Sequence, residues 1–543
     1  MPDDISKDQQ IQMKEQFTDA MDDNALLLQI SAWEEEAKEF YSDLNGIWET
    51  NLQYYLGNQT DLGRIRGRQS KAVENRIFMA TETMIPIASS RLPEIEVRPG
   101  DEDEQSQMDA DDLKDIIAYH MERVGIQEKA EKFLRNQIIF RYGVFKIDWD
   151  KQEDDLGLRL IHPKRIRIPK YGKSVDELAF VLEDLEMSFG QIKDIFGQDT
   201  ANNVLKQSPE DSDNKQRKAT YTITEVWTND FVAWKAGGTI LDKKPNPFYD
   251  FENKENNFFE KARKPYIIKS LFETDESIIG NTDYIQQMIS IQDNINIRKR
   301  QTENIIAKVA NPPLLIDSQV MSEEQAANVT NEEGLILYGN GAADGTKIRF
   351  ENPGQVPNYL FLDLEASRVQ FDNIWGIHST TRGEREGKET LGGRQLLKAA
   401  DLGRIDLVAR QLERALDEIA EWCTQLIKLF YTEEKSFTIL GEDGVRFVKN
   451  FSGKKVKKNV KPMVIAGSTL PKDEITQRQE AIQLWQLGAL GIKTLYKRLK
   501  MANVQNAIDD FIETRSGKIL QQGGGEAPIQ QSPLTPPVMG GQI

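Results

Sequence analysis

The sequence predicts a helix-rich α+β protein built from several domains, and three observations support this prediction. The chain has 543 residues, which corresponds to about three or four domains at roughly 150 residues each. Several long segments place apolar residues at helical spacing, and shorter ones alternate apolar and polar residues as strands do. The strand-like segments gather between residues 75 and 280, and the longest helical patterns follow them.

The composition argues against several classes of protein. The 87 Asp and Glu outnumber the 69 Lys and Arg and give a formal charge of -18. This net negative charge argues against a protein that binds nucleic acid tightly. With one cysteine, Cys423, and three histidines, neither an internal disulfide nor a Cys/His zinc site is expected. The first residues do not resemble a secretion signal, and no apolar run approaches the roughly 18 residues that span a bilayer. We expect a soluble protein made in a reducing compartment, without metal or cofactor.

The N-terminal segments are expected to be mostly helical. Residues 1–24 are polar and acidic and predict a flexible arm. Residues 25–55 have apolar side chains at helical spacing, and Gly57 supplies a stop. Residues 75–90 predict a second helix, which runs into the alternating, strand-like LPEIEVRPG. The acidic run DEDEQSQMDADD lacks the glycine and the closing Glu of a calcium loop, so it predicts a solvated turn before a helix.

The region that ends near residue 280 is expected to form antiparallel sheets. YGVFKIDWD alternates apolar with charged residues, and LRLIHPKRIRI supplies a second strand after a polar turn. Further strands are predicted at TITEVW, at FVAWKAGGTILD with a hairpin turn at Gly237 and Gly238, and at PYIIKSLF.

A small β unit is predicted between two long helices. Residues 282–310 contain no glycine or proline and many Gln and Asn, which predicts one long helix with polar faces. The prolines of NPPLLIDSQV end it, and GLILYGNGAADGTKIRF predicts two strands joined by a turn. NYLFLDLEASRVQFDNIWGI predicts the second helix.

The most periodic helix follows a charged, glycine-rich stretch, HSTTRGEREGKETLGGR. Its main apolar stripe recurs alternately every three and four positions and consists of Ile405, Val408, Leu412, Ala415, Ile419, Trp422, Leu426 and Leu429. A second stripe predicts that the helix is covered on two sides, either within a subunit or between subunits. Short strands and a helical segment from Pro471 follow, and the low-complexity end predicts disorder.

No catalytic constellation is recognisable. In GEREGKET, three residues separate Gly383 from Gly387, and Lys388 is followed by Glu389, so this stretch lacks the spacing and the magnesium-binding hydroxyl of a P-loop. Cys423 lies on an apolar stripe, where a packed thiol is commoner than a nucleophile. By composition alone the charged stretch is either a solvated surface loop or a loop that contacts phosphates transiently.

Several phrases, in this order and spacing, resemble the portal proteins of tailed double-stranded DNA bacteriophages. They are ENRIFMATETMIPIASSRLPEIEVRPG, YGVFKIDWD, SIIGNTDYIQQMISIQDNIN and GIHSTTRGEREGKETLGGRQLLKAADLGRIDLVARQLE. The resemblance spans about residues 30 to 510. It implies a ring-forming α+β architecture with a wing, two long stem helices, a small β clip, a tunnel loop, a long wing helix and a helical crown.

The resemblance assigns these parts to segments of the chain. After the flexible arm (1–24) come the wing (25–280), stem helix 1 (281–310), the clip (311–357), stem helix 2 (358–377), the tunnel loop (378–394), the long wing helix with β segments (395–467), the crown (468–520) and a disordered tail (521–543).

The resemblance also implies roles for individual residues. Residues expected to face DNA from the tunnel loop are Thr381, Arg382, Glu384, Arg385, Lys388 and Arg394. Stem residues expected at the channel or at subunit contacts are Gln292, Asn296, Arg298, Lys299 and Arg300. Clip residues expected to dock a partner are Leu337, Tyr338, Asn340, Lys347 and Arg349. Packing of the wing helix is expected to rest on Ile405, Val408, Leu412, Ile419, Trp422 and Leu426.

The implied function is a non-enzymatic portal at one capsid vertex, made in the host cytoplasm. Such a ring, usually a dodecamer, nucleates head assembly, docks the terminase large subunit, contacts capsid, scaffolding and tail-adaptor proteins, and passes double-stranded DNA. Two alternatives are another head-tail adaptor ring and a metal-dependent DNA-processing enzyme that uses acidic residues such as Asp101, Asp103 and Glu104. A ring of subunits that each carry a charge of -18 repels DNA generally, which favours low friction.

Overall fold

The chain is a mixture of helices and sheets, as the sequence predicts. The structure, a computed structural model, describes residues 22–59, 70–90, 93, 95–150, 153–207, 220–274, 277–310, 312, 314–317, 319–320, 322–324, 347–350, 357–379, 381–382, 391–440, 446–465, 474–499, 508 and 512. The chain divides into two compact units, residues 1–435 with 450–470 and residues 436–449 with 471–543. In the part of the chain that the structure describes, no helix is both long and apolar enough to cross a membrane.

The N-terminal helices begin and end where local signals predict. Helix α2 (Asp23–Leu56) ends at Gly57, whose φ of 83° suits glycine. Helix α3 (Arg76–Ala88) is capped by the Asn75 side chain, and α4 (Glu104–Arg123) by that of Asp103. Helix α5 (Ile126–Phe140) follows α4 after a short turn. One face of each helix is buried, so together they form much of the core.

Two antiparallel sheets fill the middle of the first unit. The three-stranded sheet has the order β3–β2–β9, with β2 at Tyr142–Asp150, β3 at Asp155–Ile161 and β9 at Tyr266–Ser270. The five-stranded sheet has the order β4–β5–β6–β7–β8 and is made of Ile166–Arg167, Val181–Met187, Tyr221–Trp227, Phe231–Ala236 and Thr239–Pro245. Helices α6 (Phe189–Phe196) and α7 (Gln198–Gln207) share a hydrophobic cluster with β6.

A buried ionic cluster joins the two sheets. The ammonium of Lys146, on β2, lies 2.6 Å from Glu183 Oε2 and 2.7 Å from Glu225 Oε2, on β5 and β6. Tyr266 donates a hydrogen bond to Glu183, and Trp227 donates one to Glu225. Burial opposes ionisation of Glu183, yet Lys146 holds the pKa of this carboxyl below its ordinary value. Each charge in the cluster is therefore compensated.

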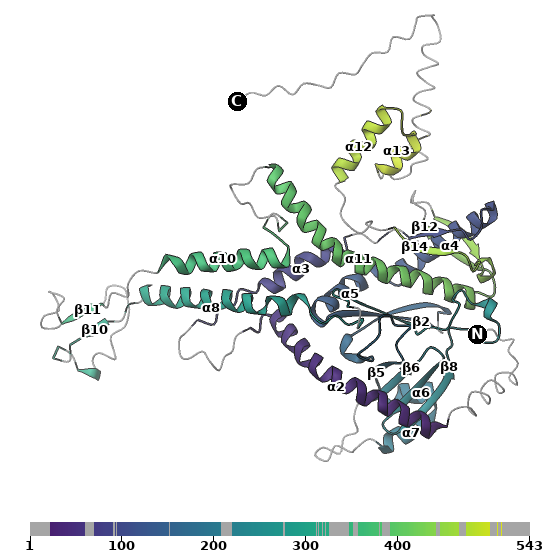
Figure 1. The fold of residues 1–543 in the computed structure, drawn as a ribbon, viewed down its shortest axis with the longest axis horizontal. Helices are drawn as coiled ribbons and strands as arrows, with labels where there is room; N and C mark the ends of the chain where they lie inside the picture. Colours follow the sequence, from purple (N-terminus) through teal and green to yellow (C-terminus); the bar gives the residue numbers. More distant parts are fainter. Residues whose placement is uncertain are drawn as a thin grey trace, which may run out of the picture. The chain divides into compact units, whose positions relative to one another are not determined.

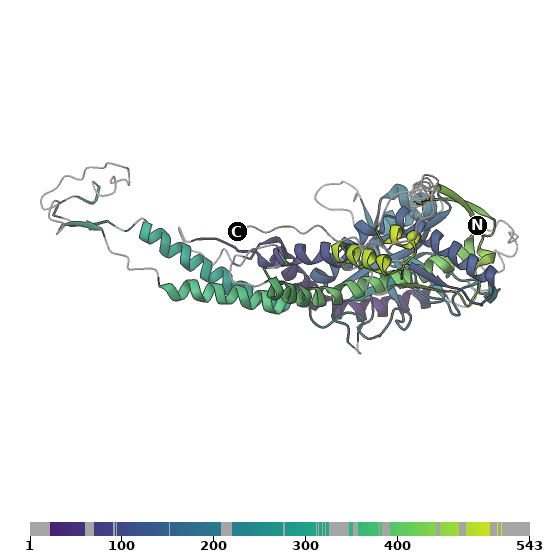
Figure 2. The same cartoon turned by 90° about the horizontal axis from the view of Figure 1, so that it is seen from above.

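Two long helices lie side by side (Figure 1). They are α8 (Tyr284–Ala310) and α10 (Asn358–Trp375), and the view from above shows the same pairing (Figure 2). Between them the sequence predicts a hairpin of GLILYG with the strand that ends at residue 350. GLILYG, residues 334–339, lies outside the described residues. The structure pairs β11 (Ile348–Phe350) with β10 (Leu314–Ile316), in the register Ile316 to Ile348. The prediction treated LLI only as part of a helix-breaking segment, although its apolar residues suit an antiparallel pair.

Helix α11 runs from Leu391 to Phe430 and begins four residues before the predicted start at 395. The predicted loop residue Arg394 is therefore helical. Strand β14 (Lys461–Val464) pairs with the distant β1 (Ile95–Arg98). The second unit holds the two-stranded sheet of β12 (Lys435–Leu440) and β13 (Arg446–Phe451), and helices α12 (Glu474–Gln486) and α13 (Ile492–Arg498).

Candidate functional site

The candidate site is the point where the charged loop leaves α10. Gly376 ends this helix with a φ of 85°, a value that L side chains rarely adopt. A Cβ atom at this position would lie 2.1 Å from Cδ of Arg404, on α11. The Arg404 guanidinium donates a hydrogen bond to the carbonyl of Ile374. Glycine thus lets α11 approach the end of α10 closely.

A buried carboxylate from α11 holds the first residues of the loop. The side chain of Asp401 is 1% exposed. Its Oδ2 accepts hydrogen bonds from the backbone N–H of His378 (2.9 Å) and the hydroxyl of Thr381 (2.5 Å), and its Oδ1 lies 2.6 Å from Nδ1 of His378. The predicted DNA-facing residue Thr381 is therefore engaged within its own chain.

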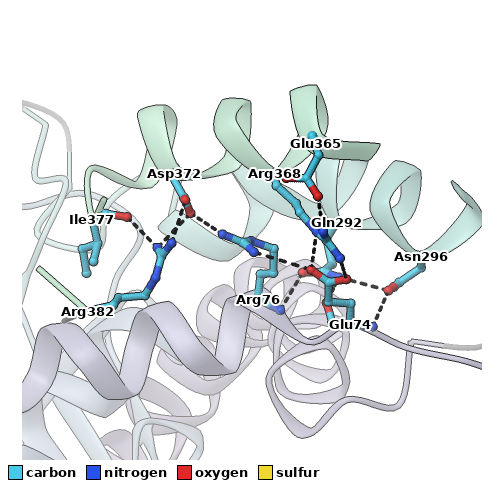
Figure 3. A network of polar contacts seen from close by, with 9 residues as sticks. All are labelled: Glu74, Arg76, Gln292, Asn296, Glu365, Arg368, Asp372, Ile377 and Arg382. Carbon is cyan, nitrogen blue, oxygen red and sulfur yellow. Dashed lines mark hydrogen bonds and ion pairs between the residues drawn. The ribbon is translucent and has the colours of Figure 1, made fainter. Parts of the chain in front are cut away.

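Arg382 is held by a second carboxylate, from α10 (Figure 3). Its Nη1 and Nη2 lie 3.0 Å and 2.9 Å from Oδ1 and Oδ2 of Asp372, and Nη1 also donates to the carbonyl of Ile377. Only 8% of the Arg382 side chain is exposed. A bidentate, nearly buried guanidinium is a structural contact, so in this conformation Arg382 is engaged by its own chain.

The same carboxylate links the loop to the start of α3. Arg76 Nη2 lies 2.7 Å from Asp372 Oδ1, so two guanidinium groups share one carboxylate. Glu74, two residues earlier, accepts hydrogen bonds from Arg368 of α10, one of them 2.8 Å long. Burial opposes ionisation of Glu74, but Arg368, helped by Arg76, holds the pKa of this carboxyl below its ordinary value. Segment 74–76 is thereby tied to α10 at two points (Figure 3).

Polar side chains of α8 bind the same segment. Gln292 accepts a hydrogen bond from the Arg76 backbone N–H (3.1 Å) and donates one to the Glu74 carbonyl (2.6 Å). Asn296 accepts one from the Glu74 N–H (3.0 Å) and donates one to Gln59. Both side chains are fully buried within the chain. Their polarity satisfies the backbone of another segment.

The other predicted stem residues form contacts along the two long helices. Arg298 pairs with Asp363 of α10 at 2.6 Å. Lys299 lies 3.9 Å from Glu303, and Arg300 donates to the carbonyl of Asn296. All three are partly exposed.

The predicted clip and loop residues are only partly described. Arg349 is exposed on β11, and the carbonyl of Lys347 accepts a hydrogen bond from Asp317. The helix that contains Arg394 is described by its backbone. The remaining predicted residues lie outside the described part of the chain: Leu337, Tyr338, Asn340, Glu384, Arg385 and Lys388.

The wing-helix residues lie in the core. Buried along α11 are Ile405, Val408, Leu412, Ile419, Trp422 and Leu426. Cys423, also buried there, has its pKa raised by burial to about 12, which is unsuited to a thiolate nucleophile. The acidic residues Asp101 and Asp103 pair with Lys457, and Asp103 also caps α4. Among the described residues, no group of three or more His, Cys, Asp or Glu is placed to hold a metal ion.

The sequence-based prediction missed the acidic partners of this site. Asp401 carried a detectable signal, because it lies four residues before Ile405 and continues the buried stripe of α11. A carboxylate on an apolar stripe requires partners. Asp372 and Glu74 carried no comparable signal, since their arginine partners come from segments distant in sequence.

A comparison with protein-family models finds a match over the part of the chain that contains this site. Residues 283–482 match the family model described as phage P22-like portal protein, and no curated protein matches the chain. The matched range contains α8, α10, the loop between α10 and α11, and α11 itself. Over residues 283–482 the chain is similar to the phage P22-like portal protein family, and this match confirms the predicted resemblance to phage portal proteins over that part of the chain.

Proposed function

We propose that this chain is the subunit of a dodecameric ring that forms the DNA channel at one capsid vertex. It is non-enzymatic, is made in the host cytoplasm and becomes part of the virion. It nucleates head assembly together with capsid and scaffolding proteins. It then docks the terminase during packaging, binds a tail adaptor and passes DNA at ejection. The family match over residues 283–482 supports the general assignment.

The observation that best supports ring formation is an uncovered apolar stripe on α10. Its inner face buries Leu360, Leu364, Phe371 and Trp375. Its outer face exposes Tyr359, Leu362 and Val369 by 66%, 70% and 56%, at positions three and seven residues apart. Apolar side chains aligned along one helix face are unfavourable in water and mark an interaction surface. A neighbouring copy of the α8–α10 pair, which exposes Ile297, Ile306 and Val309 on α8, is the occupant that we propose.

The loop is proposed to contact DNA beyond its anchored first residues. Asp372 and Asp401 engage Arg382 and Thr381, so the proposed DNA-facing cations are Arg385 and Lys388. The -18 charge of each chain disfavours tight phosphate binding, as a channel that lets DNA slide requires.

Particle mass tests the ring. Mass photometry and negative-stain microscopy of the 62.0 kDa chain are expected to show rings with a central hole. Leu362→Glu with Val369→Glu is expected to leave small species. As a matched control, Met108→Glu with Ile195→Glu changes two exposed apolar residues elsewhere and is expected to leave rings. A wild-type monomer that persists across salt and protein concentration contradicts the ring, and rings from the α10 variant contradict this interface.

Terminase docking is tested separately. Deletion of residues 339–345 is expected to leave rings intact and to abolish binding of purified terminase large subunit. Binding that survives the deletion contradicts docking through this part of the clip.

A further inference from the structure

A lysine-rich turn stands out on this acidic chain. Between residues 454 and 461, five of eight residues are lysine: Lys454, Lys455, Lys457, Lys458 and Lys461. The turn starts at the short helix η3 (Gly453–Lys455) and leads into β14. Its apolar residues Val456 and Val460 are buried, so the outward-facing side of the turn is formed by cations.

Contacts within the chain account for two of the five lysines. Lys457 donates to Asp101, Asp103 and Ser106, at the N-terminus of α4. Lys455 donates to the Asn450 carbonyl, and its ammonium lies 5.6 Å from the Phe451 ring centroid. The other three lysines are exposed and have no ion pair with any carboxylate in the described part of the chain.

Besides these three exposed lysines, a fourth cation without an ion pair lies next to the turn. Arg98 of β1 lies directly opposite Lys461 in the antiparallel register, and both are exposed. Residues opposite each other in such a pair point to the same face, and like charges in this arrangement destabilise a sheet. Glu96, on the same strand as Arg98, forms no ion pair with either cation. The carboxylate of Asp417, on α11, interacts electrostatically with Lys461 but forms no ion pair with it, so the repulsion is offset only in part. A bound anion would offset it further.

The end of helix α11 explains only part of this charge. Gly453 packs on the carbonyls of Ile427 and Lys428, and cations near a helix C-terminus are favourable. Yet Lys428 is itself half-buried, and burial, together with the charge of Lys458, lowers its pKa. The local positive charge therefore exceeds what the helix end requires.

We propose that Arg98, Lys454, Lys458 and Lys461 form a surface that binds the phosphate backbone of duplex DNA, independently of sequence and separately from the loop between α10 and α11. Lysine is depleted at protein–protein interfaces, where aromatic residues and arginine are enriched, whereas lysine is a frequent phosphate ligand in complexes with DNA. No large apolar side chain among residues 453–461 is exposed in the described structure. The choice of DNA as the polyanion rests on the portal function proposed above.

Fluorescence anisotropy with a 30-base-pair duplex of random sequence tests the proposal on the full-length protein. The variant replaces Lys454, Lys458 and Lys461 by Ala and leaves the structural Lys457 in place. The control replaces three exposed lysines on other elements, Lys38, Lys132 and Lys254, so the change in net charge is identical. At 0.1 M salt each lost phosphate contact is expected to weaken binding about eightfold, and three contacts lower the salt slope by about 2 to 3.

The outcomes separate this proposal from the ring. A loss of DNA affinity in the variant but not in the control supports the surface, whether or not mass photometry finds rings. Equal DNA affinity of variant and control in samples that do form rings overturns the surface and leaves the ring standing. Selective loss of binding to a polyglutamate peptide, with DNA binding unchanged, overturns it in favour of an acidic protein partner.

Discussion

Replacing Arg382 by Ala is expected to loosen the start of the loop while the chain stays folded. The guanidinium makes two charge-assisted hydrogen bonds to Asp372 and one to the Ile377 carbonyl. Such bonds contribute about 1.5–3 kcal/mol each when a partner is left unsatisfied. Asp372 keeps its 2.7 Å contact with Arg76, so its charge stays compensated. We therefore expect a local cost of about 2–3 kcal/mol, which is less than the sum for three bonds because Asp372 is not left unpaired.

Hydrogen exchange of the full-length protein measures this cost directly. A loss of about 2–3 kcal/mol corresponds to roughly 30- to 150-fold faster opening. The reporting amides are those of Gly376 and His378, which bond to the Asp372 carbonyl and the Asp401 carboxylate. Replacing Arg410 by Ala removes an exposed arginine that pairs with its own helix, and this control is expected to leave these amides unchanged.

Comparison with Asp372→Ala sharpens the test. That change leaves two nearly buried guanidinium groups without their shared partner, which costs about 3–5 kcal/mol, so exchange is expected to be faster than for Arg382→Ala. Exchange within threefold of wild type in the Arg382 variant would falsify the anchoring role and restore Arg382 as a candidate DNA contact.

Three further variants test the rest of the fold by thermal or denaturant unfolding. Lys146→Met leaves two buried carboxylates unpaired and is expected to lower the free energy of unfolding by about 3–5 kcal/mol. Its control, Lys244→Met, removes a half-exposed ion pair in the five-stranded sheet and is expected to change stability by less than about 0.5 kcal/mol. Equal effects of the two variants contradict the first value. Burial lowers the pKa of His120 to about 4 from its ordinary 6.5, so between these pH values the unfolded chain binds a proton that the folded chain does not. The free energy of unfolding is therefore expected to decrease as pH falls from about 6.5 to 4, by up to about 3 kcal/mol. His120→Asn should flatten that part of the pH profile, and an unchanged slope refutes the assignment. Gly376→Ala is expected to destabilise the first unit by more than about 1 kcal/mol because of the positive φ at this position and the close Arg404 side chain. Its control, Gly46→Ala, lies at an open position of α2 and is expected to stabilise the same unit by about 0.5–1 kcal/mol. The reverse order of stabilities contradicts the role of Gly376.

Sequence patterns predicted the helices and most strands because those elements depend on local signals. Helix α10 starts after Pro357 and ends before Gly376, and the prolines at 312 and 313 follow α8. The start of α11 was predicted too late, because Gly392 and Gly393 resemble loop residues. Two glycines cost a helix about 1 kcal/mol each, and each added residue of a 40-residue helix gains a hydrogen bond that offsets such costs.

The site could not be predicted to the same degree, because its contacts join distant segments. Arg76 and Asp372 are 296 residues apart, and no periodicity specifies that pairing. Gln292 and Asn296 show the limit clearly, since polar residues four apart on a helix look the same whether they face water or the backbone of another segment. Asp401 is the exception, because a charge that continues an apolar stripe signals a buried partner.

The pairing of β1 with β14 has a consequence for how the chain is made. Ile95 pairs with Val464, so 369 residues separate the two partners, and at 5–20 residues per second the ribosome needs roughly 20 to 70 s to supply the second strand. Throughout that interval β1 has an unpaired edge that a neighbouring nascent chain could occupy. Its outward residues, Glu96 and Arg98, are charged, which is how natural strands resist such pairing. The delay therefore makes this short strand a point where expression temperature and translation rate decide between folding and aggregation.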